Sequence, residues 1–141
     1  MALGAVLVVA AAGSGATPAT RETRSPAQVV RAWSRDLNAN RNEAAARLFA
    51  PGARIVEPPS LDVRLGTHAL AVAFNASLPC GGRIARLQVH GARVVATFVL
   101  GERPHHTCDG PGAKAAALFV VRNGRIALWK RVPVPTGAQT V

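Results

Sequence analysis

Two side chains that could move a proton stand at the ends of predicted strands. Glu57 closes an apolar run just before Pro58-Pro59, and His90 follows the run 83–89. A carboxylate or an imidazole acts as a general acid or base when it lies in a dry pocket. The alternative for both is an exposed position, with Glu57 paired to Arg54, because acidic side chains rarely lie buried. Glu57 and His90 are the candidate catalytic residues, and the exposed position is the preferred interpretation.

The loop around Cys108 holds the densest group of metal-ligating residue types, which comprises His105, His106, Cys108 and Asp109. Imidazole and thiolate ligands would suit zinc or copper. A bridged Cys108 cannot also be a thiolate ligand, and adjacent histidines often point apart. We therefore predict that the chain binds no metal and no cofactor.

Cys80 and Cys108 are the two cysteines of the chain, and both have polar, loop-forming neighbours. An even number of cysteines in an exported chain is first interpreted as a disulfide framework. Closing a loop of this length stabilises the folded state by about 3–4 kcal/mol if the effect is chain entropy. The sequence predicts a disulfide between Cys80 and Cys108.

The first residues have the composition of an export signal. Residues 2–13 form an uninterrupted run of apolar or small side chains, which is as long as a signal-peptide core and too short to cross a bilayer. Small residues follow, so a signal peptidase could cut after Ala16 or Ala19. No Lys or Arg precedes the run, and the alternative is a buried N-terminal strand. We predict a signal peptide over 1–19, a secreted or cell-envelope location, and no stable membrane span after cleavage.

The net charge of +10 comes from 17 Lys and Arg residues against 7 Asp and Glu residues. Nucleic-acid-binding surfaces concentrate such charge, and those for single strands interleave it with aromatic rings. Here the arginines are dispersed along the chain, and no aromatic residues alternate with them. We predict no specific nucleic-acid partner. Arginines gathered on one face of the folded chain would instead indicate attraction to anionic envelope polymers.

The elements that position these residues can be read from changes in periodicity. Ser25-Pro26 is a capped helix start, and Asn42 is the cap of a second, short helix that Pro51-Gly52 stops. Gly66-Thr67 opens a third helix. The first helix carries its apolar residues on one face: Val29, Val30, Trp33 and Leu37. The predicted strands are 54–57, 62–65, 83–89, 93–100, 114–121 and 125–132, the last two joined by an Asn123-Gly124 turn.

This order predicts an α+β fold, in which helices cover one face of a curved, mostly antiparallel sheet. In a meander, the third and fifth strands lie parallel on either side of the fourth. Cys80 precedes the third strand and Cys108 precedes the fifth, so we expect both cysteines at the same edge of the sheet. Two strand spacings are about 10 Å, which the loops must shorten before a disulfide can form.

Several short motifs follow one another between residues 26 and 133: Ala32-Trp33-Ser34, the run 44–53, the run 66–70, and Asn123-Gly124-Arg125-Ile126 followed by Trp129. In this order and spacing they resemble the nuclear transport factor 2-like superfamily, in particular its bacterial SnoaL-like branch. The resemblance implies a cone-shaped domain with three N-terminal helices, whose mouth holds a small hydrophobic ligand, often in a homodimer. Members include isomerases, cyclases, epoxide hydrolases and many proteins without a known activity.

The sequence departs from the catalytic members that it resembles. They commonly place an acid after the first two helices, where this chain has Gly52-Ala53, and another late in the final strand, where it has 131–133. We therefore predict an exported, non-catalytic binding or interaction domain with an apolar pocket. The alternative is an isomerase- or hydrolase-type enzyme that uses Glu57 or His90 for proton transfer.

Aromatic residues on the elements that should line the cone are the predicted ligand-binding residues: Trp33, Phe74 and Trp129. The indole N–H groups of the two tryptophans each need a polar partner, which favours a role beyond packing. Phe98 and Phe119 are interpreted as core residues. The predicted domain spans 26–133, with a linker over 20–25 and a disordered tail over 134–141.

Overall fold

The computed structural model describes Gly13, Gly15 and residues 23–137. The predicted signal peptide, apart from these two glycines, lies outside the described residues, as do residues 20–22 of the linker and the end of the predicted tail. None of the helices formed by the described residues has the length and apolarity required to cross a membrane.

The first helix, α1 (Pro26–Asn38), begins as its sequence predicts. The Ser25 hydroxyl accepts a hydrogen bond from the Gln28 backbone N–H at 3.2 Å, and the Gln28 side chain accepts one from the Ser25 N–H at 2.8 Å. This reciprocal capping box satisfies two of the N–H groups that a helix start leaves free. All four predicted apolar residues of α1 are buried. The helix therefore packs through the face that the periodicity predicted.

The two other helices are shorter. Helix α2 (Asn42–Arg47) has no side-chain cap, so the predicted N-cap role of Asn42 is wrong. The Asn42 side chain instead accepts a hydrogen bond from the Arg103 guanidinium. Helix α3 (His68–Ser77) is capped by Thr67, whose hydroxyl accepts a hydrogen bond from the Leu70 N–H at 3.2 Å.

Six strands form one sheet in the order β2-β1-β6-β5-β4-β3. Neighbouring strands are antiparallel except β1 and β6, which are parallel. The strands are β1 (Phe49–Glu57), β2 (Leu61–Leu65), β3 (Gly81–His90), β4 (Arg93–Gly101), β5 (Lys114–Arg122) and β6 (Arg125–Val132). The predicted meander of the last four strands, with β3 and β5 on either side of β4, is confirmed.

The start of β1 differs from the prediction. Pro51-Gly52 does not stop a helix but lies inside β1, which already begins at Phe49. Phe49 pairs with Ile126 of β6, and the Ile126 N–H donates to the Leu48 carbonyl at 2.8 Å. The pairing register shifts between Phe49 and Arg54, and Gly52 has a φ of +73°, which glycine adopts without strain. Burial of Phe49 against the sheet thus outweighs the local stop signal.

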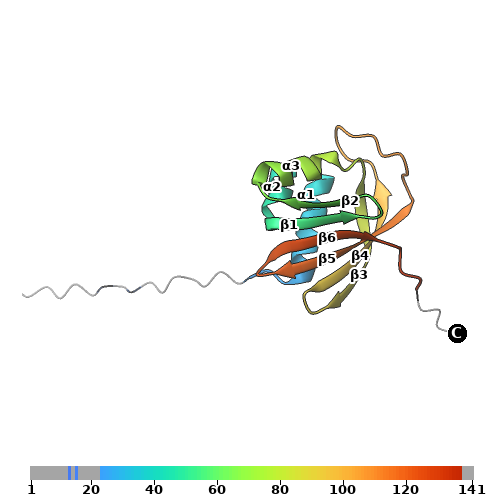
Figure 1. Cartoon of the computed structure of the whole chain (residues 1–141). Helices are drawn as coiled ribbons and strands as arrows, with labels where there is room; N and C mark the ends of the chain where they lie inside the picture. Colours follow the sequence, from blue (N-terminus) through green and yellow to red (C-terminus); the bar gives the residue numbers. More distant parts are fainter. Residues whose placement is uncertain (1–12, 14, 16–22, 138–141) are drawn as a thin grey trace, which may run out of the picture.

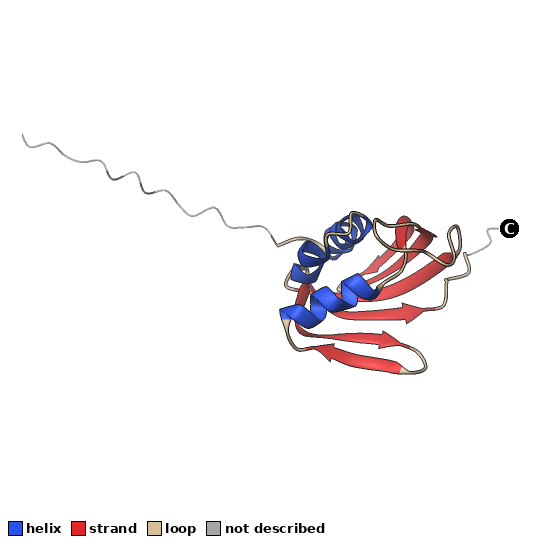
Figure 2. Ribbon diagram, turned by 90° about the horizontal axis from the view of Figure 1, so that it is seen from above, coloured by secondary structure: helices blue, strands red, loops and turns tan. Residues whose placement is uncertain are grey.

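The three helices cover one face of the sheet, which curves around them (Figures 1 and 2). The predicted α+β class is therefore confirmed. The predicted layer of three N-terminal helices is present only in part. Helix α2 has only 6 residues, and α3 comes after the β1–β2 hairpin rather than before the strands. The largest fully buried apolar side chains between the layers are Val29, Val30, Ile55, Val94, Phe119 and Ile126.

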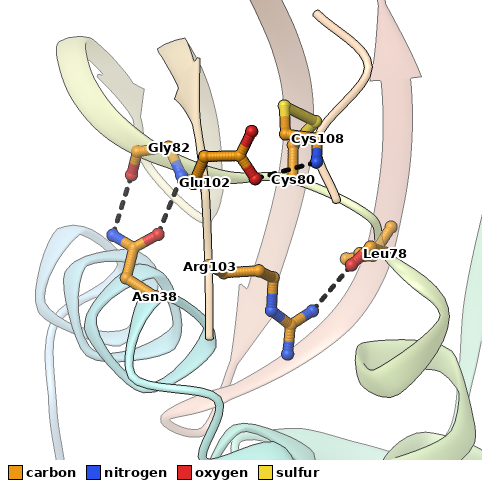
Figure 3. Close-up of a disulfide and its surroundings, with 7 residues drawn as sticks. All are labelled: Asn38, Leu78, Cys80, Gly82, Glu102, Arg103 and Cys108. Atoms are coloured by element: carbon orange, nitrogen blue, oxygen red, sulfur yellow. Dashed lines mark hydrogen bonds between the residues drawn. A yellow bond between two sulfur atoms is a disulfide. The ribbon is translucent and has the colours of Figure 1, made fainter. Parts of the chain in front are cut away.

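At the β3 edge of the sheet, a side chain takes the hydrogen bonds that a further strand would make. The Asn38 amide donates to the Gly82 carbonyl at 2.9 Å and accepts from the Gly82 N–H at 2.8 Å (Figure 3). These are the two hydrogen bonds that a neighbouring strand would make with β3 at this point. A side chain at Gly81 would collide with the same Asn38 amide, which explains the glycine there.

Candidate functional site

A cavity of about 460 Å³ lies between the helices and the sheet. Its walls come from helices α1 and α3, the segment that joins α3 to β3, the loop between β4 and β5, and residues of all six strands. The apolar lining includes Trp33, Leu37, Phe74, Leu78, Phe98, Leu100 and Trp129, and the ionisable lining residues are Glu57, Asp109 and Arg131. Mostly apolar walls with few polar groups are typical of small-molecule sites.

The three predicted ligand-binding residues, Trp33, Phe74 and Trp129, all line this cavity. Trp33 makes an edge-on contact with Phe98, with ring centroids 6.1 Å apart, and Phe74 makes one with Trp129 at 5.2 Å. Such contacts hold each ring by its neighbour. Phe98 also lines the cavity, whereas Phe119 lies behind Trp33 and is fully buried in the core.

The two tryptophans differ in how their indole N–H groups are used. The Trp33 Nε1–H donates to the Asn75 side-chain oxygen at 2.8 Å, and the Asn75 amide donates in turn to the Ala71 carbonyl. The buried Trp129 Nε1–H has no acceptor among the described residues. The predicted need for a polar partner is therefore met within the fold at Trp33 and unmet at Trp129.

Glu57 lies on the cavity wall, as a catalytic candidate should, but its carboxylate is not isolated. The Glu57 Oε1 is 3.5 Å from Nε of Arg131, and the side chains are 36% and 52% exposed. The predicted pairing of Glu57 with Arg54 is wrong, because the Arg54 Nε–H donates to the Asp62 carboxylate on β2 at 2.8 Å. Glu57 and Arg131 thus form a partly exposed ion pair at the cavity, across the parallel β1–β6 pair.

His90 is not part of this site. It ends β3, pairs with Arg93 beside the hairpin turn, is exposed, and does not line the cavity. The structure thus places His90 in the exposed position that the sequence analysis preferred, away from the cavity. The reason is its place in the sheet: the lining residues of β3 are Gly81 and Gly82 at its start, and His90 is its last residue.

A buried arginine behind the cavity was missed by sequence reasoning. Arg103 is 3% exposed, and its guanidinium donates to the carbonyls of Asn75 and Leu78 at 2.8 Å each. It also donates to the side-chain oxygens of Asn40 and Asn42 at 2.8 and 2.6 Å. We call Arg103 with these four acceptors the Arg103 clamp; Figure 3 shows Arg103 and its hydrogen bond to Leu78. Burial lowers the pKa of the Arg103 guanidinium, because desolvation disfavours its charge.

The predicted disulfide is present beside the Arg103 clamp. Cys80 and Cys108 are bonded, with their Cα atoms 4.6 Å apart, so the loops have closed the distance between β3 and β5. The Cys108 N–H donates to the Glu102 carboxylate at 3.0 Å, and Cys80 forms part of the cavity wall. The bridge thus ties the loop between β4 and β5 to the segment that lines the cavity.

The histidines of that loop do not assemble with Cys108 into a metal site. His106 places its ring nitrogens 2.9 and 2.8 Å from the carbonyls of Pro104 and Ala76. Within the part of the chain that the structure describes, no three His, Cys, Asp or Glu residues are placed to share a metal ion. His106 therefore fastens the loop to α3.

The dispersed arginines gather only in part. An open groove between α1 and strands β3 and β4 is lined by four of them: Arg31, Arg35, Arg41 and Arg83. Arg35 and Arg41 lie 3.5 and 3.4 Å from the Asp36 carboxylate, and Glu102 lines the same groove. Because acidic groups offset this charge, the groove does not form the uniform basic face that an anionic polymer would require.

No family model matches the sequence, and no curated protein matches it significantly. Solved structures match the fold. An NTF2-like protein of unknown function from Cytophaga hutchinsonii is 12% identical, with a TM-score of 0.63 over 80% of this chain and 93% of that one. A candidate polyketide cyclase from Pseudomonas putida is 18% identical, with a TM-score of 0.58 over 79% and 92%.

A third structure comes from Catenulispora acidiphila and has a ketosteroid isomerase-like fold in complex with trimethylamine. It is 17% identical, with a TM-score of 0.59 over 75% of this chain and 85% of that one. At these identities the likeness concerns the arrangement of the backbone and leaves activity open.

Proposed function

We propose that this chain, which has the nuclear transport factor 2-like fold, is an exported domain that binds a small, largely apolar molecule in its cavity. The observation that carries the proposal is the cavity of about 460 Å³ with Trp33, Phe74 and Trp129 in its walls. A volume in this range holds a small organic molecule, and aromatic walls supply most of the contact area.

Two further observations support the proposal. A protein of similar fold was solved in complex with trimethylamine, which is a small organic molecule. The Cys80–Cys108 disulfide supports the export part, because such bonds persist in oxidising compartments and are rare in the reducing cytosol.

The non-catalytic part rests on the ionisable groups of the cavity wall. Glu57 is partly exposed and paired with the exposed Arg131, and Asp109 is exposed as well. General acid–base catalysis needs a group held in a water-excluded site. No described residue of the wall provides a buried carboxylate or imidazole.

Binding can be tested with the neutral fluorescent probe N-phenyl-1-naphthylamine and the disulfide-bonded protein. Ala115 lines the cavity and is partly buried, so Ala115→Leu should fill the space and weaken probe binding at least about tenfold. Ala85 is exposed on β3 and lies outside the cavity, so Ala85→Leu is the matched control. Equal binding to both variants would place the probe elsewhere and overturn the proposal.

Export can be tested by intact mass of the protein recovered from its host's culture medium. The proposal expects loss of the first 16 to 19 residues, with cleavage after Ala16 or Ala19, and alkylation of both cysteines only after reduction. A full-length product confined to the cell with free thiols would contradict it.

The enzymatic alternative has one structural argument, which is the position of Glu57 on the cavity wall. Proton transfer by Glu57 would exchange acidic C–H protons of a bound carbonyl compound for deuterium in heavy water. Exchange that disappears in Glu57→Gln but persists in Glu43→Gln would favour the enzyme. The homodimer implied by the resemblance stays a prediction, which sedimentation equilibrium can check.

A further inference from the structure

The charge of the cavity wall differs from that of the whole chain. The chain carries 17 basic and 7 acidic residues, yet the wall carries Glu57 and Asp109 and, as its basic residue, Arg131. A molecule with a net charge of +10 therefore presents more negative than positive groups where the ligand would lie.

The positive group of the wall is already engaged. Arg131 lies 3.5 Å from the Glu57 carboxylate, so these two charges largely offset each other. Asp109 forms no ion pair with any described residue. Arg103 is not a residue of the wall, and its guanidinium is buried among carbonyl and amide oxygens. Among the residues that line the cavity, the unbalanced charge is therefore that of Asp109, which is negative.

The aromatic side chains favour the same sign of charge. Trp33, Phe74, Phe98 and Trp129 all contribute to the wall, and aromatic rings attract cations through the negative potential of their faces. An apolar wall also disfavours strongly hydrated ions, so a cation that enters must carry apolar substituents. Tertiary and quaternary ammonium groups have this character.

We infer that the cavity binds an apolar organic cation, whose nitrogen lies near Asp109 and whose hydrocarbon body contacts the aromatic wall. This inference rests on the proposed function, because it names the chemical class of the ligand for the same cavity. An anionic ligand is disfavoured, since it would approach two carboxylates to reach an arginine that Glu57 already holds.

Three compounds with one hydrocarbon body test the sign of the charge directly. They are trimethyl(4-phenylbutyl)ammonium, 4-phenylbutan-1-ol and 4-phenylbutanoate, each titrated by calorimetry into the full, disulfide-bonded protein. The cation should bind about tenfold more tightly than the alcohol, and the carboxylate should bind least tightly. A carboxylate that binds most tightly would overturn the inference.

Isosteric variants locate the effect. Asp109→Asn should weaken binding of the cation about threefold or more and leave the alcohol unchanged. Glu57→Gln should leave Arg131 without its carboxylate partner and reduce the difference in affinity between the cationic ligand and the carboxylate ligand. Glu43→Gln removes an exposed acid on α2, outside the cavity, and should change neither compound.

The outcomes separate this inference from the proposed function. If alcohol and cation bind with equal affinity and Asp109→Asn changes nothing, the inference is wrong while binding in the cavity stands. If none of the three binds and the fluorescent probe is insensitive to Ala115→Leu, the proposed function itself is wrong.

Discussion

Arg103 and Arg131 both place a guanidinium close to the cavity, but protein atoms surround only the first. Arg103 is 3% exposed and donates hydrogen bonds to four oxygen atoms of the protein. Arg131 has a side chain 52% exposed and approaches one carboxylate, that of Glu57, at 3.5 Å. The buried Arg103 guanidinium thus stabilises the fold, whereas the Arg131 guanidinium, with its Glu57 partner, stays accessible at the cavity.

The Arg103 clamp is therefore structural, and the Glu57–Arg131 pair is the adjustable part of the site. The clamp joins the α1–α2 turn, the end of α3 and the β4–β5 loop, which are three segments far apart in sequence. Exposed ion pairs contribute little to stability because water already solvates both charges. Six variants, grouped in four experiments, test how far this division holds.

The largest effect should follow loss of the clamp. Arg103→Met leaves the side-chain oxygen of Asn42 and the carbonyl of Leu78 without a donor and removes the shorter of two hydrogen bonds at Asn40 and Asn75. This loss should lower the free energy of unfolding by about 4 kcal/mol. Arg131→Met removes an exposed guanidinium of the same size and should cost less than about 1 kcal/mol. Urea denaturation with the disulfide intact gives both values. Equal losses would contradict the division.

Removal of the disulfide should come next. Cys80→Ser with Cys108→Ser opens a loop with a sequence separation of 28, and the entropy gained by the unfolded chain should lower stability by about 3–4 kcal/mol. The same loop carries Arg103, so the bridge and the clamp should be coupled. A double-mutant cycle with Arg103→Met measures this coupling, and strict additivity would show that the two ties act independently.

The two tryptophans allow the same comparison between a hydrogen-bonded and an unbonded polar group, with smaller expected losses of stability. Trp33→Phe leaves the Asn75 oxygen without its donor and should cost about 2 kcal/mol. Trp129→Phe removes a buried N–H that has no described acceptor, so it should cost about 1 kcal/mol or less. Denaturation of both single variants decides the order, and a larger loss at Trp129 would mean that its N–H has an acceptor.

The smallest effect concerns an exposed pair, Glu43 and His68, which is not part of the clamp. The hydrogen bond with His68, at 2.9 Å, and its charge lower the pKa of Glu43 below its ordinary value of 4.5. A lowered folded-state pKa stabilises the fold above pH 4.5, and this contribution is lost as the pH falls through the folded pKa. His68→Gln should raise the Glu43 pKa toward 4.5, as carboxyl NMR titration can show. An unchanged value would assign the shift to Arg47 instead.

Sequence reasoning succeeded where neighbouring residues decide the outcome. The Ser25-Pro26 start, the apolar face of α1 and the Asn123-Gly124 turn depend on local chemistry and are all present. The disulfide was predicted from the even number of cysteines in an apparently exported chain, and the strand order makes it possible, because β3 and β5 lie on either side of β4. Trp33, Phe74 and Trp129 line the cavity, and their role in binding a ligand stays a prediction.

It failed where distant contacts override local signals. Pro51-Gly52 reads as a helix stop, but parallel pairing with β6 keeps it within a strand. Arg103 lies in a loop and resembles the other arginines in sequence, so nothing local marks it as buried. His90 was a catalytic candidate because it ends a strand, and the direction of β3 decides at which end the cavity lies.

The contact of Asn38 with Gly82 has a further consequence for solubility. An edge strand offers unpaired N–H and C=O groups to other chains, which is a common route to aggregation. The Asn38 amide occupies these groups at the start of β3, the register shift between Ile84 and Arg86 interrupts the edge further along, and both Arg83 and Arg86 are exposed. At the opposite edge, β2 has 5 residues and carries Asp62 and Arg64. Both borders of the sheet thus discourage the addition of a foreign strand.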